Sequence, residues 1–222
     1  MKIGIIVAMD KEYEQLQKVA QSMEQHVIVL AKCGIGKVNA ALGAQQMINE
    51  HHPDIIISSG CAGGNGDDIN VQDVVVSTEL TYHDVYCGTA IDDCTVYGQV
   101  QGLPARYAAD SKLLAAALSL KTSLSDREGV GLHPGLIVTG DWFVDSKDKM
   151  RSIVDKFPEA KAVDMESCAI AQVCHIYKVP FISFRVISDI PLRDTDASQY
   201  HNFWDTIAEN SFQVTKSFLE AI

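Results

Sequence analysis

Three acidic residues stand at the ends of predicted elements, where acid–base chemistry could be done. Glu12 follows the first apolar run, Glu166 precedes a helical pattern, and Asp189 ends a second apolar run directly after Ser188. Open α/β sheets bind their ligands beyond the carboxyl ends of the strands, and packing explains a carboxylate there poorly. We therefore expect Asp189 to be the acid of a catalytic site.

Glu12 also has a simpler explanation, because it lies in the first turn of a helix predicted over residues 10–23. The helix dipole favours a negative charge there, and Asp10 could cap the helix. Taken alone, this surface role is the better interpretation. However, Glu12 comes just after the first strand, at the same sheet edge as Asp189, and this position favours a role in the site.

The segment 163–189 organises the rest of the chain. A short apolar stretch leads into a helix, since apolar residues recur at three- and four-residue spacing from Ala169 to Tyr177. After a tight turn at 178–180, residues 181–189 form an apolar run with little alternation, which is typical of a central strand covered on both faces.

Two glycine-rich stretches follow predicted strands. The first, Gly34-Ile35-Gly36, lacks the pattern of a dinucleotide-binding loop, because Asn39 stands where a glycine or alanine is needed. We expect a tight turn there and no cofactor. The second, residues 60–66, follows a strand predicted at 54–59. It could present backbone amides to a ligand or form a plain flexible turn, and the sequence favours neither.

Other polar and aromatic residues fall at strand ends. Phe143 and Val144 follow a strand predicted at 135–139. They could be ordinary core residues, or, if a site lies nearby, they could flank the flat ring of a ligand. His83 beside Asp84 suggests an oriented imidazole, although lone histidines are more often structural. Metal-ligand spacing is absent, so we expect no metal. The long polar segment 85–105 suits a lid or a partner contact.

Length and composition indicate one globular unit. The chain has 222 residues, 47% of them hydrophobic, enough for one large core. Strands alternate with helices from residue 1 to residue 222, through a last helix predicted at 203–219. This order predicts a single α/β domain with one central mixed sheet flanked by helices.

The net charge limits the classes of binding partner that we expect, and the cysteines indicate the cellular compartment. The formal net charge of −11 argues against nucleic acid and against an anionic membrane surface. No run approaches the roughly 18 apolar residues of a membrane span, and residues 1–9 read as a strand rather than a signal peptide. The six cysteines show no CxxC pairing, so we expect thiols and a cytoplasmic protein.

Seven blocks in this order resemble one enzyme family: KIGIIVAMDKE, CGIGKVNAALGA, DIIISSGCAGG, TYHD, GLIVTGDWF, AVDMESCAIAQVCH and VPFISFRVISD. The family is the 5′-methylthioadenosine/S-adenosylhomocysteine nucleosidases of the purine nucleoside phosphorylase-like superfamily. The resemblance runs from Met1 to the last helix. It implies a nucleoside phosphorylase-like fold, a homodimer, an adenine nucleoside as small-molecule partner, and hydrolysis of the adenine–ribose bond.

The resemblance also assigns roles to residues of the matching blocks. Glu12 would hold the attacking water, Glu166 would bind the ribose 2′- and 3′-hydroxyls, and Asp189 with Ser188 would protonate N7 of adenine. Met165 would lie under the ribose.

Around the base, Phe143 would stack and the backbone near Val144 would read the edge of the ring. Tyr200 is favoured over Phe203 as the aromatic lid over the thioalkyl end. The glycine-rich block supplies further predicted contacts at Cys61, Ala62 and Gly63.

Some positions depart from the family pattern. Cys61 stands where the family more often has serine, and Asp164 replaces a glutamate as a shorter acid at the edge of the site. The segment 85–104 departs most, so the sequence does not decide which 5′ substituent of the substrate is preferred. Methylthioadenosine, S-adenosylhomocysteine, 5′-deoxyadenosine and aminodeoxyfutalosine are all candidate substrates.

Two alternative functions remain on the same fold. A phosphorylase must hold a phosphate dianion with arginines, yet Ser58 stands where related phosphorylases carry arginine. Lys37 and Arg185 are the few basic residues near the site in sequence, so water is the favoured acceptor. A catalytically silent nucleoside-binding or storage protein would be expected to lack the acid or the water-binding carboxylate, and both are present.

Overall fold

The computed structural model describes residues 1–222 except 89–95, 122–129, 194–198, 201 and 204–208. One eight-stranded mixed sheet forms its centre, in the order β2-β1-β3-β7-β6-β4-β5, and β8 pairs with β3 and β4. The strands are β1 (Lys2–Val7), β2 (Val27–Lys32), β3 (Ile55–Gly64), β4 (Val74–Tyr82), β5 (Tyr107–Ala108), β6 (Leu132–Thr139), β7 (Ala160–Asp164) and β8 (Phe181–Asp189). The predicted α/β class with a central mixed sheet is confirmed.

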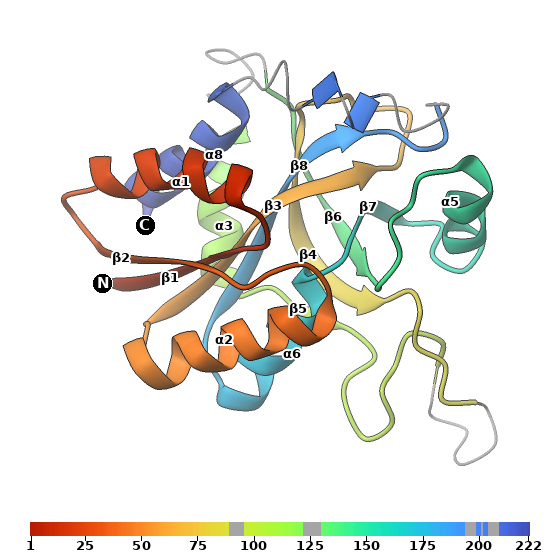
Figure 1. Ribbon diagram of the computed structural model, residues 1–222, viewed down its shortest axis with the longest axis horizontal. Helices are drawn as coiled ribbons and strands as arrows, with labels where there is room; N and C mark the ends of the chain where they lie inside the picture. The colour runs from red at the N-terminus through yellow and green to blue at the C-terminus, as the bar shows by residue number, and fades with distance from the viewer. Residues whose placement is uncertain (89–95, 122–129, 194–198, 201, 204–208) are drawn as a thin grey trace.

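Helices cover both faces of this sheet (Figure 1). They are α1 (Asp10–Ser22), α2 (Lys37–His51), α3 (Ser111–Ser119), α5 (Lys147–Val154), α6 (Ser167–Tyr177) and α8 (Glu209–Ala221). Helices α1, α3 and α8 pack together over one face, and α2 packs along α6 on the other. None of the described helices has the length and apolar character that crossing a membrane requires.

Side-chain alternation along the strands builds two cores. In β1, Ile3, Ile5 and Val7 join the core under α1, α3 and α8, whereas Ile6 joins the core under α2 and α6. This is the period of two that a strand imposes on its side chains. Strand β8 is buried along all nine residues, between β3 and β4, as its unbroken apolar run predicts.

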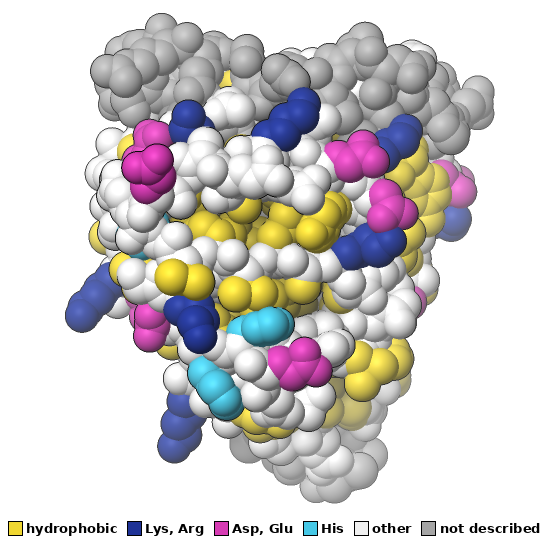
Figure 2. Space-filling view, turned by 60° about the vertical axis from the view of Figure 1, so that its left-hand side comes forward, with side chains coloured by type: hydrophobic (Ala, Val, Ile, Leu, Met, Phe, Trp, Pro, Cys, Tyr) yellow, Lys and Arg dark blue, Asp and Glu magenta, His cyan; other side chains and the backbone are white. Residues whose placement is uncertain are grey.

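The edge of the sheet at β2 is less covered. Among the described strands, β2 pairs with β1 alone, and each of its six residues is at least partly exposed. Hydrophobic side chains accordingly reach the surface on this side of the molecule (Figure 2).

Two strand assignments differ from the sequence prediction. Strand β3 continues through the second glycine-rich stretch to Gly64, where it crosses β7 (Gly64 against Ala162), so the flexible-turn interpretation is wrong. A side chain at Gly64 would meet the side chain of Ile187 in β8 at 2.8 Å, so glycine leaves the room that Ile187 needs. The start of segment 163–189, predicted as a short apolar stretch before the helix, is the end of β7 (Ala160–Asp164), a strand that the sequence analysis did not predict.

Candidate active site

A pocket opens beyond the carboxyl ends of β1, β3 and β8, and its wall holds every predicted site residue. These are Glu12, Cys61, Ala62, Gly63, Phe143, Val144, Asp164, Met165, Glu166, Ser188, Asp189 and Tyr200. Trp142, which stands beside Phe143 in the predicted aromatic stretch, also lines the pocket, and the sequence analysis missed Ala8, Met9, Ile35 and Val163. They are ordinary apolar residues whose types give no signal of a site.

Glu12 is 2% exposed and belongs to the pocket, so its interpretation as a surface residue is wrong. Its Oε2 accepts hydrogen bonds from the backbone N–H groups of Ala8 (2.9 Å) and Met9 (3.0 Å), and its Oε1 accepts one from Cys61 (2.9 Å). The predicted cap is also wrong: Asp10 is the first residue of α1, and its carboxylate pairs with Lys32.

Burial raises the pKa of Glu12, and the charge of Arg185 and the three N–H donors oppose that rise. A carboxylate has about four lone-pair sites. Three are taken by backbone donors, which leaves one on Oε1 for a water molecule. Glu12 is thus a fixed acceptor with the raised pKa that suits a general base.

Glu166 sits at the N-cap position of α6, and its Oε1 accepts a hydrogen bond from Gly36 N–H at 3.0 Å. Burial raises the pKa of Glu166 to about 7, with help from the neighbouring Asp164 charge and against the pull of Arg185. Glu166 therefore titrates close to neutral pH.

Asp189 lies at the end of β8 and is 8% exposed. The hydroxyl of Ser188, which is also buried, donates to Asp189 Oδ1 at 2.6 Å and approaches the carbonyl oxygen of Ala62 at 3.3 Å. The structure thus joins the two residues that the sequence analysis paired. A hydroxyl donor on one oxygen fixes the orientation of the carboxyl group at the pocket wall.

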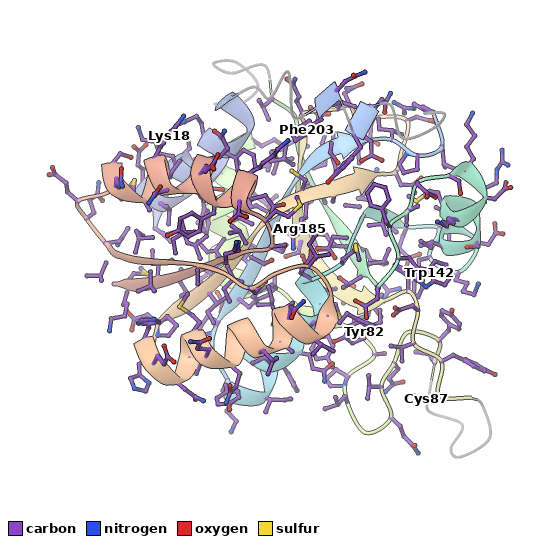
Figure 3. The ribbon with its side chains drawn as sticks, in the orientation of Figure 1. Lys18, Tyr82, Cys87, Trp142, Arg185 and Phe203 are labelled. Atoms are coloured by element: carbon purple, nitrogen blue, oxygen red, sulfur yellow. The ribbon has the colours of Figure 1, made fainter. Side chains whose placement is uncertain are left out.

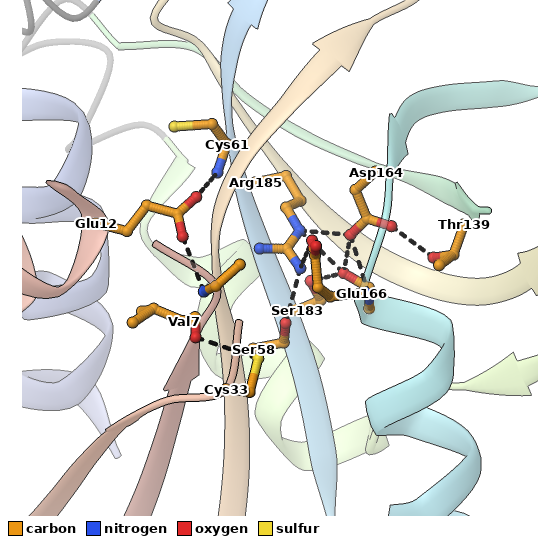
Figure 4. Close-up of polar contacts among 12 residues, drawn as sticks. Val7, Glu12, Cys33, Ser58, Cys61, Thr139, Asp164, Glu166, Ser183 and Arg185 are labelled. Atoms are coloured by element: carbon orange, nitrogen blue, oxygen red, sulfur yellow. Dashed lines mark hydrogen bonds and ion pairs between the residues drawn. The ribbon is translucent and has the colours of Figure 1, made fainter. Parts of the chain in front are cut away.

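Arg185 is the functional residue whose importance the sequence analysis missed. It is 2% exposed in the middle of β8, near the centre of the molecule (Figure 3). Its Nε donates to Asp164 Oδ2 (2.6 Å) and its Nη2 to Ser58 Oγ (2.9 Å), and Glu166 Oε2 lies 4.0 Å from Nη2 (Figure 4). A charged residue inside a buried apolar strand was the available signal, whereas Asp189 was selected by its position at the end of the same strand.

Charge balance holds Arg185 in place. Burial lowers the pKa of Arg185, but the carboxylates of Asp164, Glu166 and Glu12 outweigh it, and the net effect raises the pKa. Asp164 lines the pocket, yet its carboxylate is fully buried and bonded to Arg185, Thr139 and Ser167. Its acid group therefore anchors the arginine instead of facing the cavity.

Cys61 contributes a neutral thiol to the wall. Burial raises the pKa of Cys61 well above its usual range, and the nearby Glu12 charge raises it further. A protonated thiol is a weak nucleophile, so covalent catalysis by Cys61 is not favoured.

Aromatic rings close the other side of the pocket. Tyr200 meets Phe143 edge-on at 5.1 Å between ring centroids, and its hydroxyl lies 4.0 Å from Met9 Sδ. Phe203 is instead 2% exposed within the core beneath α1 and α8. The choice of Tyr200 over Phe203 thus agrees with the packing.

His83 does not fit its prediction as an imidazole oriented by Asp84. Neither ring nitrogen of His83 has a hydrogen-bond partner among the described residues, and burial lowers its pKa. Asp84 instead binds Lys37 and the backbone of Asp141. Within the described part of the chain, no group of histidine, cysteine, aspartate or glutamate residues has metal-site geometry.

Comparison with known proteins identifies the family. The family model described as "Phosphorylase superfamily" matches residues 2–220. A 5′-methylthioadenosine/S-adenosylhomocysteine nucleosidase of Anoxybacillus flavithermus is 38% identical over 235 aligned positions, which cover 97% of each chain. The chain belongs to this nucleosidase family. The Bacillus subtilis nucleosidase is 35% identical and is covered over its full length.

Solved nucleosidase structures share the fold. The Neisseria meningitidis enzyme, in complex with methylthio-immucillin-A, superposes with a TM-score of 0.88 at 36% identity, over 100% of this chain and 99% of that one. The Colwellia psychrerythraea enzyme, in complex with adenine, gives 0.89 at 33% identity, over 100% and 95%. The nucleoside phosphorylase-like architecture expected from the sequence motifs is therefore confirmed.

Proposed function

We propose that this nucleosidase hydrolyses the N-glycosidic bond of 5′-substituted adenine nucleosides, releasing adenine and a 5-substituted ribose. Methylthioadenosine, S-adenosylhomocysteine and 5′-deoxyadenosine are the proposed substrates. The observation that carries the proposal is the convergence of Glu12, Glu166 and Asp189 on one pocket with an aromatic wall. The names of the relatives support the same reaction.

Asp189 is the proposed acid. Adenine is a poor leaving group as an anion, so a proton must reach its imidazole nitrogen as the bond breaks. Ser188 fixes the carboxyl group at 2.6 Å, and the strand end aims it into the cavity. The aromatic wall formed by Phe143 and Tyr200 suits a flat base beside this acid.

Glu12 and Glu166 act on the sugar. The bond breaks through an oxocarbenium-like state, and carboxylates near the ribose are attracted more strongly as positive charge develops there. Glu12, fixed by three N–H donors, is the proposed water-binding base. Glu166 is the proposed acceptor for the ribose hydroxyls.

Water is favoured over phosphate as the acceptor. The described pocket wall holds no lysine or arginine side chain. Behind it, Arg185 is already bonded to Asp164 and Ser58 and is surrounded by more carboxylates than it can neutralise. A phosphate dianion would meet net negative charge, which electrostatics disfavours.

The function is tested by adenine release from the three nucleosides and from aminodeoxyfutalosine, with inosine as the control for a different base. We expect kcat/KM to be unchanged by added phosphate, and the sugar product to be free rather than phosphorylated. Phosphate-dependent release would establish phosphorolysis instead. Tight adenine binding without turnover would establish a silent binding protein.

We also propose a homodimer that acts in the cytoplasm. Helices α2 and α6 pack side by side, and five hydrophobic side chains on them or just before α2 are each at least 43% exposed: Ile35, Val38, Leu42, Ile176 and Tyr177. Monomers rarely leave such a face uncovered. Free thiols at the described cysteines suit a reducing compartment.

The assembly is tested by placing a charge on this face. Leu42→Asp is expected to shift the mass measured by light scattering from dimer to monomer, because Leu42 is 61% exposed on α2 within the proposed interface. Leu118→Asp on α3, at an exposed apolar site over the other face of the sheet, is the matched control. A dimer that persists in Leu42→Asp would contradict the proposed interface.

A further inference from the structure

We propose that Asp84 is a positioning residue, which ties the sugar side of the pocket to the base side. The carboxylate lies two residues beyond the end of β4 and its side chain is 9% exposed. Asp84 is not among the residues that line the pocket. The inference rests on the proposed role of Glu166 in holding the ribose.

The carboxylate of Asp84 is shared between two segments. Both of its oxygens accept from Lys37 Nζ at 2.8 Å, and Oδ2 also accepts from the backbone N–H of Asp141 at 2.8 Å. Bidentate, charge-assisted bonds of this kind fix geometry as well as adding energy. One buried anion therefore sets the spacing between residue 37 and residue 141.

The first segment leads to the sugar side. Lys37 is the first residue of α2, and the preceding Gly36 donates its N–H to Glu166 Oε1. Gly36 has a φ of 92°, and a side chain there would approach Asp141 Oδ1 at 3.0 Å. A shift of Lys37 would thus carry with it the N–H that orients Glu166.

The second segment leads to the base side. Asp141 accepts from Lys37 N–H through Oδ1 at 2.8 Å, and the chain continues directly into Trp142, Phe143 and Val144, which line the pocket. Trp142 packs edge-on against His83 at 5.2 Å between ring centroids. The start of segment 141–144 is therefore held at two neighbouring residues: Asp84 binds the backbone of Asp141, and the His83 ring packs against Trp142.

Lys37 and Asp141 alone would hold the two sides less firmly. Their side chains are 3.8 Å apart, and Asp141 is 48% exposed, so water competes for that contact. Without Asp84, the Lys37 ammonium would turn toward Asp141 or solvent, and the Asp141 N–H would lose its acceptor. Loosening both walls should weaken substrate binding and misplace Glu166 in the transition state.

The test compares Asp84→Ala and Asp84→Asn with Asp73→Asn. Asp73 is a matched control, because its buried carboxylate accepts the N–H groups of Gly131 (2.9 Å) and Asn70 (2.8 Å) away from the pocket. We expect kcat/KM of Asp84→Ala to fall about 10- to 100-fold, the loss typical of a small misplacement. Asp84→Asn should lose less, since its amide oxygen still accepts from Asp141. Asp73→Asn should keep kcat/KM within about twofold.

A double-mutant cycle separates positioning from simple stability. If Asp84 acts in part through Glu166, the loss caused by Asp84→Ala should be clearly smaller in a Glu166→Ala background, where only the loss through the base side remains, because coupled residues are not additive. A full loss in that background, or normal kcat/KM in folded Asp84→Ala, would overturn the inference. If the wild-type enzyme showed no turnover, that result would refute the proposed function but not the role of Asp84. The affinities of the same variants for methylthioadenosine, measured by calorimetry, would then be compared in place of kcat/KM.

Discussion

Gly60→Ala is the substitution whose effect on activity the structure predicts most directly. Gly60 lies in β3 with ordinary strand geometry, so alanine meets no backbone strain. Its Cβ, however, would lie 2.4 Å from Arg185 Nη1 and 2.6 Å from Glu12 Oε1. The methyl group would enter the gap between the buried guanidinium of Arg185 and the carboxylate of Glu12.

The size of the effect follows from these distances. Ordinary contact begins at 3.4 Å, so Arg185 Nη1 must move by about 1.0 Å and Glu12 Oε1 by about 0.8 Å to make room. Neither moves freely, because Arg185 is bonded to Asp164 and Ser58, and Glu12 to three backbone N–H groups. A misplacement of about 1 Å can reduce turnover by about 10²-fold, and we expect that loss in kcat/KM.

Stability should change less than activity. Overpacking costs about 1–3 kcal/mol, while replacing glycine by alanine restricts the unfolded chain and returns about 0.4–1 kcal/mol. Urea denaturation should therefore show a folded protein with a free energy of unfolding lowered by about 2.6 kcal/mol or less. The activity loss would then report geometry rather than unfolding.

Gly135→Ala is the matched control. Gly135 lies in β6 outside the pocket, and its Cβ would be too close to both Cγ and Cβ of Lys161 in β7. The two strands must therefore shift slightly, as at Gly60, but neither Glu12 nor Arg185 is touched, so kcat/KM should stay within about threefold of wild type. Near-normal turnover in folded Gly60→Ala would refute the reasoning that Glu12 and Arg185 are rigidly placed for catalysis.

Three further substitutions test the charged groups. Asp189→Asn should lower kcat by at least about 10²-fold while nucleoside affinity by calorimetry largely survives; normal turnover would remove Asp189 as the acid. Because burial raises the pKa of Glu166 from 4.5 to about 7, its ionisation lowers the free energy of unfolding as the pH rises through that interval. Glu166→Gln should therefore be more stable than wild type at pH 8 in urea denaturation, with the difference shrinking toward pH 4.5, and a constant difference would contradict the shift. Arg185→Met should lower the free energy of unfolding by about 3–5 kcal/mol in the same assay, because it leaves buried carboxylates unpaired. An unchanged urea midpoint would show that those carboxylates are protonated.

The sequence determined the elements whose patterns are local. The unbroken apolar run of β8 predicted a buried central strand, and the carboxylates after β1 and β8 predicted one shared edge. Strand direction alone brings such residues together, since parallel strands present their carboxyl ends on the same side. Glu12, Ser188 and Asp189 could therefore be chosen from position and residue type.

Tertiary structure alone decided how the charges are paired. Asp164 and Arg185 lie 21 residues apart and Ser58 and Arg185 127 apart, and no local pattern joins them. From its sequence, the glycine-rich end of β3 could have been a turn or a stretch of ligand-facing amides, yet it is a strand: Gly64 pairs with Ala162 of β7, and a side chain at Gly64 would meet Ile187 of β8. Glu12 likewise satisfied the rules for a surface helix start, and only the packed sheet shows it buried against Cys61 N–H. Burial and partner choice depend on elements distant in the chain, and for that reason the fold fixes them and the sequence pattern does not.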